Sequence, residues 1–312
     1  MSEGTRYEIG YGKARIPVYR VYATPLRAVT PIPESAFTGR ENILFAAEID
    51  VEVLGDDFLP AYTEGDNRMV VATDSMKNFV LRESLSYQGA TFEALLDHLG
   101  RRFVATYPQL RSLRLTGHEL PFVAAPVPSG DGSFAASPVL FDRDHGDHAT
   151  AMLEIVEDAD DVRVAAHRCG RIGMQLLKVT GSSFTSFVRD GYTTLPERVD
   201  RPLFVHLDVH WRYANVEDLL SPDPARYVPA EQVRDLVRTV FHGFVSESIQ
   251  HLVHEMGVRL LDRFPQLAEV EFTAQNRTPD PAAISEADSR CKVYTDPFSA
   301  YGLITLKLSR ES

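Results

Sequence analysis

An aromatic residue and an arginine near the middle of the chain could together hold a flat anion. Phe184 and Arg201 enclose a Thr-rich loop that contains Pro196, and Arg201 comes just before an expected strand. A phenyl ring can stack on a planar ligand, and a guanidinium can grip an anion through two parallel hydrogen bonds. Taken alone, a core phenylalanine and a surface arginine explain this segment more simply, because most phenylalanines are buried.

A hydroxyl and a carboxylate stand side by side at the end of an apolar run. Met69–Ala72 is apolar, and Thr73 and Asp74 follow it directly, just before the pattern of an amphipathic helix. Such residues commonly cap helices, and losing a cap costs about 1 kcal/mol. A helix start also binds anions, because its first N–H groups have no partner within the helix. Capping is the simpler interpretation, and the two roles are compatible.

Two clusters of histidine and aspartate offer a different chemistry, the binding of a metal ion. His206, Asp208 and His210 alternate along an expected strand. The outer two Cα atoms then lie roughly 13 Å apart, too far for all three side chains to bind one ion without bending. The segment from Asp142 to His148 holds three aspartates and two histidines, a composition more typical of a solvated turn. We therefore expect no metal site.

An internal repeat organises the elements that must position these residues. Tyr107-Pro108-Gln109-Leu110 returns almost half the chain later as Phe264-Pro265-Gln266-Leu267. Each copy follows an expected amphipathic helix, and another helix precedes that one in both halves. The apolar stripes of the two matching helices are formed by Phe92, Leu95, Leu96, Leu99 and Phe103, and by Ile249, Leu252, Val253, Met256 and Leu260.

Strands flank both helix pairs. Residues 47–53 and 203–211 alternate apolar and polar side chains, which is typical of an antiparallel sheet with helices on one face. We therefore predict an α+β fold of two tandem repeats, residues 1–158 and 159–312, each with the order strand, strand, helix, helix, strand, strand. The exposed sheet edges predict association across subunits. Residues 125–137, rich in Pro, Gly and Ser, are expected to form a loop.

Charge and composition argue against several classes of protein. The formal net charge of −12 disfavours a general nucleic-acid binder, which needs a basic surface. Only two cysteines are present, which argues against a disulfide framework and for a reducing compartment. No apolar run is long enough to cross a membrane, and the first residues lack the apolar stretch of a signal peptide. We expect a cytoplasmic protein that binds neither nucleic acid nor membrane.

Longer motifs make the chain resemble the urate oxidase (uricase) family. They are Tyr11-Gly12-Lys13, the sequence GDN followed by VVATDSMKN within residues 63–78, a long motif that begins at Phe184 and continues with RDGYTTLPERVDR at 189–201, and Ile249-Gln250. The resemblance implies the tunnelling fold, in which ββααββ repeats assemble into an oligomeric barrel, here as a homotetramer with active sites between subunits. It also implies oxidation of urate by O2 and water to 5-hydroxyisourate and hydrogen peroxide in purine degradation, without a metal or organic cofactor.

The same resemblance implies the roles of single residues. Arg201 would fork onto the urate anion while Phe184 stacks on its ring, and the Gln250 amide would pair with the purine edge. Lys13 and Thr73 would form a proton relay, because a buried lysine is less basic and can take a proton through a hydroxyl. The full expected substrate-binding set is Thr73, Asp74, Phe184, Leu195, Arg201, Ile249, Gln250 and Asn276.

One position departs from the family pattern. The family often has a histidine two residues after the asparagine that corresponds to Asn276, where it completes the relay with lysine and threonine. Here that residue is Thr278. A hydroxyl can pass a proton, but it cannot act as a base near neutral pH. Thr278 therefore keeps the third place in the expected catalytic relay with an open role, such as holding a water.

Two other functions stay open on the sequence alone. A metal-dependent purine or pterin enzyme of the same fold would use the histidine and aspartate clusters, and zinc that survives dialysis would favour it. A purine-binding or assembly protein would keep the pocket without turnover, and urate binding without O2 consumption would favour that function.

Overall fold

The computed structural model describes residues 6–158, 161–221, 223–277, 279–296 and 299–310. These residues divide into two compact units. The first unit takes in the described parts of 1–30, 38–169 and 215–227, and the second takes in those of 31–37, 170–214 and 228–312. The predicted boundary between repeats follows residue 158, at the end of a strand, and its next residue lies outside the described part. That boundary stays a prediction.

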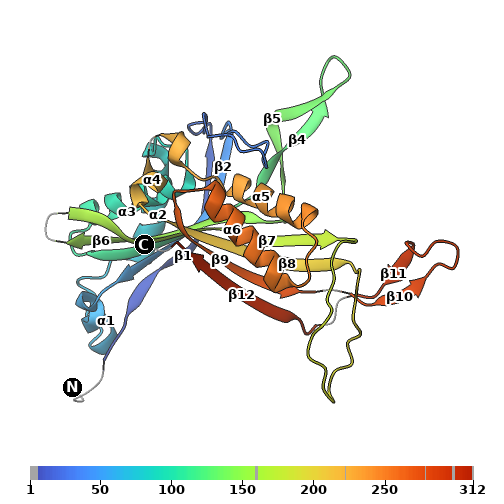
Figure 1. Ribbon diagram of the computed structural model, residues 1–312. Coiled ribbons are helices and arrows are strands. Elements are labelled where there is room, and N and C mark those ends of the chain that lie inside the picture. Colours follow the sequence, from blue (N-terminus) through green and yellow to red (C-terminus); the bar gives the residue numbers. More distant parts are fainter. Residues whose placement is uncertain (1–5, 159–160, 222, 278, 297–298, 311–312) are drawn as a thin grey trace. The chain divides into compact units, whose positions relative to one another are not determined.

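In the first unit an antiparallel sheet carries a pair of helices (Figure 1). The strands β1 (Gly10–Val21), β2 (Leu44–Leu54), β3 (Ser112–Glu119) and β6 (His148–Asp158) are neighbours in that order, and the first part of β7 (Asp161–Lys178) follows. α2 (Thr73–Ser86) packs against β1, and α3 (Phe92–Thr106) packs against β3 and β6. Shorter helices are η1 (Asp56–Phe58), α1 (Leu59–Thr63), α4 (Val216–Leu220) and η2 (Pro224–Arg226). Within the described ranges, none of the helices has the length and apolar character needed to cross a membrane.

Alternation along the strands produces the core of this unit. On β2, Ile49, Val51 and Val53 are buried, whereas the acidic residues between them are partly exposed. The expected apolar stripe of α3 faces the buried side of the sheet. Gly100 lets α3 approach β6 closely, because a Cβ atom at this position would lie 2.0 Å from Ile155 Cδ1.

The second unit repeats this plan with the rest of β7. β8 (Leu203–Tyr213), β9 (Leu267–Asn276) and β12 (Gly302–Ser309) follow in that order, and both β8–β9 and β9–β12 pair antiparallel. α5 (Ala230–Gly243) and α6 (Ile249–Arg263) contact each other, and α6 lies on β9 and β12. Gly257 again allows a close approach, since a Cβ atom there would lie 2.4 Å from Leu308 Cδ1.

The two helix pairs match residue by residue. α2 and α5 each have 14 residues, and α3 and α6 each have 15. The same number of residues separates Thr73 from Ala230 as separates Gly100 from Gly257, so no insertion has shifted one pair relative to the other. The predicted α+β fold, with the order ββααββ in each half, is confirmed.

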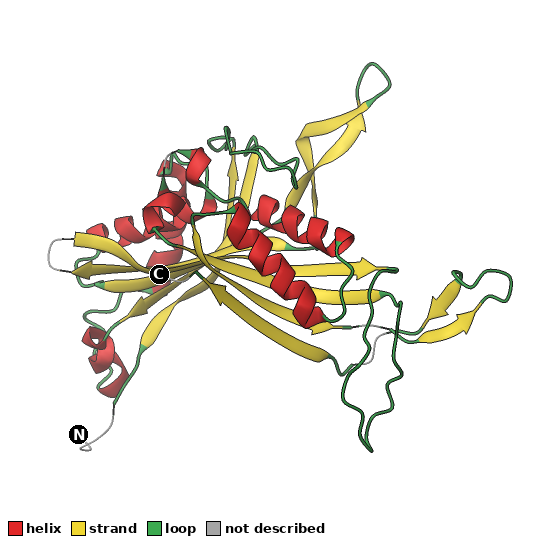
Figure 2. Ribbon diagram, in the orientation of Figure 1, coloured by secondary structure: helices red, strands yellow, loops and turns green. Residues whose placement is uncertain are grey.

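Each unit also carries a two-stranded hairpin (Figure 2). In the first unit it consists of β4 (Phe122–Pro128) and β5 (Phe134–Arg143), and in the second of β10 (Pro281–Ile284) and β11 (Lys292–Tyr294). The prediction of a loop over residues 125–137 is therefore wrong for most of that segment. Proline is tolerated in β4 because, among the described residues, the strand pairs with β5 alone, and its register shifts between Ala124 and Pro126.

Candidate active site

The second unit contains a pocket that gathers several of the expected site residues. Its volume is about 470 Å³. Its walls are formed by residues from the stretch 195–202, by the end of β9, by the β10–β11 hairpin and by residues 300–302. Leu195, Arg201 and Asn276 all line it. The pocket therefore brings Asn276 together with two residues of the 189–201 motif, which lies far from it in the sequence.

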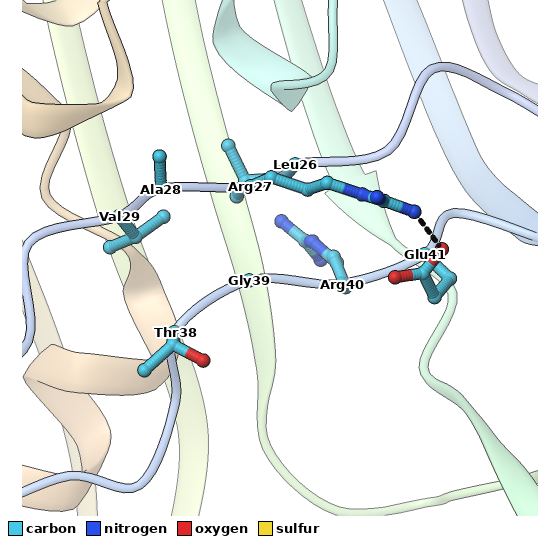
Figure 3. Close-up of a pocket in the computed structure, with 8 residues that line it drawn as sticks. All are labelled: Leu26, Arg27, Ala28, Val29, Thr38, Gly39, Arg40 and Glu41. Carbon is cyan, nitrogen blue, oxygen red and sulfur yellow. Dashed lines mark hydrogen bonds and ion pairs between the residues drawn. The ribbon is translucent and has the colours of Figure 1, made fainter.

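The first unit contains a second pocket, of about 490 Å³, between two chain segments (Figure 3). Arg27 and Arg40 line it, and each of them faces a carboxylate. Arg27 contacts Glu41 at 2.7 Å, and Arg40 contacts Glu119 at 2.9 Å. Because its positive charges are already balanced, this pocket is a weaker candidate for an anionic substrate than the pocket that contains Arg201.

A short ladder of main-chain hydrogen bonds brings Phe184 and Arg201 together. Phe184 and Arg198 exchange N–H···O bonds of 2.8 and 3.0 Å. The Arg201 N–H donates to the Ser182 carbonyl at 2.9 Å. As a result, the Arg201 guanidinium carbon lies 5.4 Å from the centroid of the Phe184 ring, within the range of a cation–π contact. The cation and the aromatic ring expected to bind one planar ligand are thus side by side.

Asp200 fixes the end of this ladder next to Arg201. Its carboxylate accepts from the Gly181 N–H at 2.8 Å and from the Thr180 hydroxyl at 2.8 and 3.0 Å. These bonds, that of Gly181 first, hold the pKa of Asp200 below its ordinary value. The residue adjacent to Arg201 is therefore anchored by its own side chain, which helps to fix the backbone from which Arg201 projects.

Arg201 is partly buried and carries an unused hydrogen-bond donor. Its Nε atom is buried and has no hydrogen-bond partner among the described residues. Burial lowers the pKa of Arg201, and the neighbouring charge of Arg198 lowers it further, yet an arginine remains protonated near neutral pH. A buried donor left unpaired costs about 1–3 kcal/mol. A bound anion would remove this cost and balance the charge.

Asn276 forms part of the pocket wall at the end of β9. Opposite it in the sheet is Gly302, the first residue of β12. The guanidinium of Arg277 lies 4.3 Å from the centroid of the Tyr301 ring. It also donates to Gln275 Oε1 through Nη2 at 2.8 Å and through Nε at 3.1 Å. These contacts stabilise the end of β9, where Asn276 lies.

Ile249 and Gln250 open α6, but neither of them lines the pocket. Ile249 is buried and Gln250 is exposed. Ser248 caps the helix through its hydroxyl. The chain just before the helix is tied to the Arg201 ladder, because the Ser183 N–H donates to the Ser246 carbonyl at 2.9 Å. The expected roles of Ile249 and Gln250 remain predictions.

The remaining expected residues within the described ranges belong to the first unit. Lys13 lies on β1, and α2 begins with Thr73 and Asp74. Lys77 chiefly, with help from Asn78 and Lys13, holds the pKa of Asp74 below its ordinary value. Lys13 and the start of α2 lie on neighbouring elements, because α2 packs against β1. Thr278, expected as the third member of the relay, lies outside the described residues.

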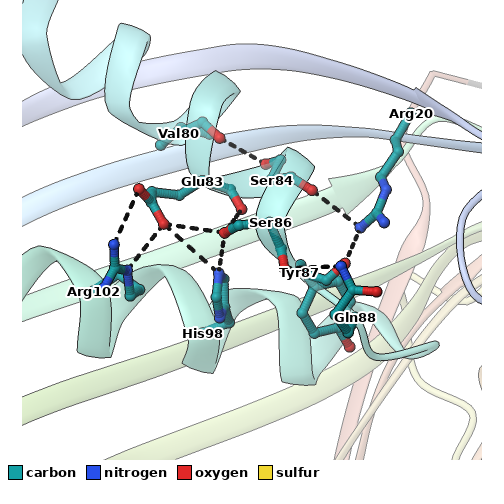
Figure 4. Close-up of polar contacts among 9 residues, drawn as sticks. All are labelled: Arg20, Val80, Glu83, Ser84, Ser86, Tyr87, Gln88, His98 and Arg102. Atoms are coloured by element: carbon teal, nitrogen blue, oxygen red, sulfur yellow. Dashed lines mark hydrogen bonds and ion pairs between the residues drawn. The ribbon is translucent and has the colours of Figure 1, made fainter.

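Two side chains of β1, those of Tyr11 and Arg20, tie α2 and the residues that flank it to this strand, which also carries Lys13. Just before the helix, the Val71 N–H donates to the Tyr11 hydroxyl at 3.0 Å. Near the other end, the Arg20 guanidinium donates to the Ser84 carbonyl at 3.0 Å and also to the Tyr87 carbonyl (Figure 4). Because the helix is held to β1 at both ends, the positions of Lys13 and Thr73 are fixed relative to each other.

The interpretation of Thr73 and Asp74 as helix caps is wrong. The cap position is occupied by Ala72, and no side chain accepts a hydrogen bond there. The Asp74 carboxylate instead accepts from Lys77 at 2.6 Å and from Asn78 at 2.9 Å, both in the helix itself. The Tyr11 contact at Val71 already fixes the chain where it enters α2. The first N–H groups of α2 therefore stay without a side-chain cap among the described residues.

The histidine and aspartate clusters have other contacts. Asp208 accepts from the Gly173 N–H at 2.7 Å, and the His206 ring lies 5.0 Å from that of Phe204. In the 142–148 segment, Asp144 accepts from the Gly146 N–H, as in an ordinary turn. In the part of the chain that the structure describes, no three His, Cys, Asp or Glu residues are arranged to hold a metal ion.

Three charged residues of the pocket carry no individual signal in the sequence. Arg198, Asp280 and Lys292 line it together with Arg201. Charged residues are common in loops, so none of them stands out by type. The place of Arg198 inside the motif at 189–201, three residues before Arg201, is the one feature that could have drawn attention to it.

Fold and pocket together define a class: an α+β protein of ββααββ units that presents a partly buried arginine beside an aromatic ring. A family model described as Uricase matches residues 167–305. Over 271 residues the chain is 46% identical to the uricase of Haloferax volcanii, covering 86% of this chain and 88% of that protein. The chain belongs to the uricase family, and the resemblance seen in its motifs is confirmed.

Two further comparisons extend over nearly the whole chain. The uric acid degradation bifunctional protein PucL of Bacillus subtilis (strain 168) is 43% identical over 303 residues, which are 97% of this chain. The chain spans only 61% of the length of that bifunctional relative. The solved structure of urate oxidase from Bacillus sp. TB-90 is 42% identical, with a TM-score of 0.94, and the match covers 97% of this chain and 100% of that chain.

Proposed function

We propose that this chain is a urate oxidase of purine degradation. It oxidises urate with O2 and water and releases 5-hydroxyisourate and hydrogen peroxide. Membership of the uricase family supports this activity. The observation that carries it is the environment of Arg201, a partly buried cation with an unpartnered Nε, beside Phe184 and in one pocket with Leu195 and Asn276.

Binding depends on the shape and charge of urate, which is a flat anion. Arg201 forks onto its carbonyl-side atoms, and the Phe184 ring stacks on the purine. Leu195 closes one wall, and Asn276 faces the side of the ring where O2 or water must sit. Gln250 and the Ile249 N–H pair with the purine edge from the start of α6. The first turn of α2 adds Thr73 and the Asp74 N–H.

The reaction balances without an added redox group. Urate gives up two electrons, O2 takes them together with two protons to become hydrogen peroxide, and water supplies the oxygen atom that enters the product. Proton movement is therefore the task left to the protein. Lys13 and Thr73 pass protons between urate, water and O2, with Thr278 at the third position of this relay. We accordingly propose a cofactor-independent enzyme.

The active assembly is a homotetramer with its sites between subunits. Two long strands support this part of the proposal, because among the described residues β1 pairs with β2 alone and β12 pairs with β9 alone. Unpaired strand edges of this length favour pairing with another chain. Lys13, Thr73 and Asp74 belong to the first unit and the remaining described site residues to the second. A neighbouring subunit can then supply one group to the other.

The test follows urate absorbance, O2 uptake and hydrogen peroxide together, with protein freed of metal by a chelator. We expect urate and O2 to be consumed in equal amounts, at the same rate as before the chelator treatment. Urate binding without O2 uptake would leave a purine-binding protein. A rate that disappears with the metal and returns with added zinc would favour a metal-dependent enzyme, and either outcome would overturn the proposal.

A further inference from the structure

A second arginine lines the pocket beside Arg201. Arg198 is held by its main chain directly opposite Phe184, through N–H···O bonds of 2.8 and 3.0 Å. Its side chain lines the same pocket as Arg201. The position of Arg198 is thus set by backbone pairing, whereas its guanidinium is left to interact with whatever occupies the pocket.

The ion pair between the Arg198 guanidinium and Asp280 is weak. The nearest oxygen of Asp280 lies 3.8 Å from Arg198 Nη2, beyond hydrogen-bond distance. The two side chains are 32% and 52% exposed, so water screens their attraction. The other acidic residue of the pocket, Asp200, is already engaged by Thr180 and Gly181. A negatively charged ligand can therefore compete for Arg198.

Two guanidinium groups on one pocket repel each other. The charge of Arg198 contributes to the lowered pKa of Arg201, although burial is the larger cause. An anion placed between them reduces this repulsion, whereas a neutral purine of the same shape obtains only stacking and hydrogen bonds. The charge of the ligand, and not only its outline, should consequently decide how strongly it binds.

We propose that Arg198 is a specificity-determining residue that favours anionic purines over neutral ones, and that Asp280 limits this preference. The proposal rests on the proposed function, because urate is the anion concerned. Arg198 acts through its charge at the pocket wall, while Arg201 makes the direct fork. Binding of urate should therefore depend on Arg198 more than turnover of bound urate does.

The central variant is Arg198→Gln, which keeps the backbone ladder and removes the charge. We expect KM for urate to rise about fivefold with kcat unchanged, and the salt dependence of kcat/KM to flatten, as is usual when a rim charge is lost. Inhibition by xanthine, at a pH where xanthine is neutral, should stay the same. Arg198→Lys keeps the charge and should stay near the parent KM.

Two companion variants sharpen the result. Asp280→Asn removes the competing carboxylate, so KM for urate should fall about twofold, the opposite direction to Arg198→Gln. Arg290→Gln is the charge-matched control, because Arg290 pairs with Asp288 at 2.9 Å and does not line the pocket. It should leave KM unchanged. Melting temperatures of all variants show whether each chain is folded.

Three outcomes of the kinetic measurements would overturn the proposal. They are an Arg198→Gln enzyme with the parent KM, a loss confined to kcat, and an equal loss of neutral xanthine binding. If the parent protein fails to oxidise urate, the proposed function is lost, and the role of Arg198 is then decided separately by calorimetry. Urate titrated into parent and Arg198→Gln protein without O2 should still show weaker binding to the variant, and equal affinities would refute it.

Discussion

Replacing Arg201 by lysine should weaken urate binding without weakening the fold. An ammonium keeps the charge, but it cannot form the planar fork that grips an anion through two bonds. Hydrogen bonds to charged groups contribute about 1.5–3 kcal/mol, so losing one predicts a KM about 10- to 150-fold higher. The Nε of Arg201 has no hydrogen-bond partner among the described residues. The substitution therefore breaks no bond at that atom, and the melting temperature should not fall.

Steady-state kinetics, urate titration without O2 and thermal melting together test this separation of binding from stability. Arg212 provides the matched control, because it pairs with Glu269 at 3.0 Å and does not line the pocket. Arg212→Lys should leave KM unchanged. A folded Arg201→Lys enzyme with the KM and kcat of the parent would refute the reasoning. A large drop in its melting temperature would contradict the expectation that Arg201 does not stabilise the fold.

Other contacts predict further outcomes. Asp200→Ala should raise KM for urate about tenfold, because it loosens the main-chain ladder before Arg201. The double variant with Arg201→Lys should raise KM by less than the product of the two single effects. Strictly additive free energies would contradict this coupling. Glu83→Gln should lower stability at neutral pH by at most about 1 kcal/mol. Arg102 chiefly holds the pKa of Glu83 below its ordinary value (Figure 4). The stabilisation by this ion pair is therefore present above the ordinary pKa of a glutamate and is lost as the pH falls through the lowered pKa. A stability difference between parent and variant that persists in acid would argue against this. Thr73→Ala and Arg201→Ala chains, each nearly inactive alone, should regain partial activity when co-expressed with different tags. Mixed oligomers without activity would place the site within one chain.

The repeat and the alternating strands were predictable because they depend on local periodicity. The stripe on α3 and the buried face of β2 follow directly from the order of apolar residues. The division into units was not predictable in the same way. Residues 31–37 belong with the second unit and 215–227 with the first. Such exchanges depend on tertiary contacts, which leave no periodic signal in the segments themselves.

Candidate site residues could be predicted where a sequence motif contains them, but not where only the folded geometry brings them into the pocket. Phe184 and Arg201 came from one long motif, and the ladder that joins them explains why its two ends meet. The capping interpretation of Thr73 failed because the helix begins at Thr73 itself, which places Ala72 at the cap position. Arg198 gave no signal through its residue type, because the role proposed for it depends on the pocket around it.

The unbroken match between the helix pairs has a consequence for how such a site could arise. If the two halves descend from one duplicated unit, every helix start once had a twin with the same surroundings. The twin of Thr73 is Ala230 and the twin of Gln250 is Glu93, and both twins are buried. In each half, therefore, a different helix start is accessible and the other is buried. The buried Glu93 carboxylate accepts a hydrogen bond from the Tyr227 hydroxyl at 3.0 Å. After duplication, each half would have contributed a different helix start to the site. A single substitution in one half could not give it both helix starts again.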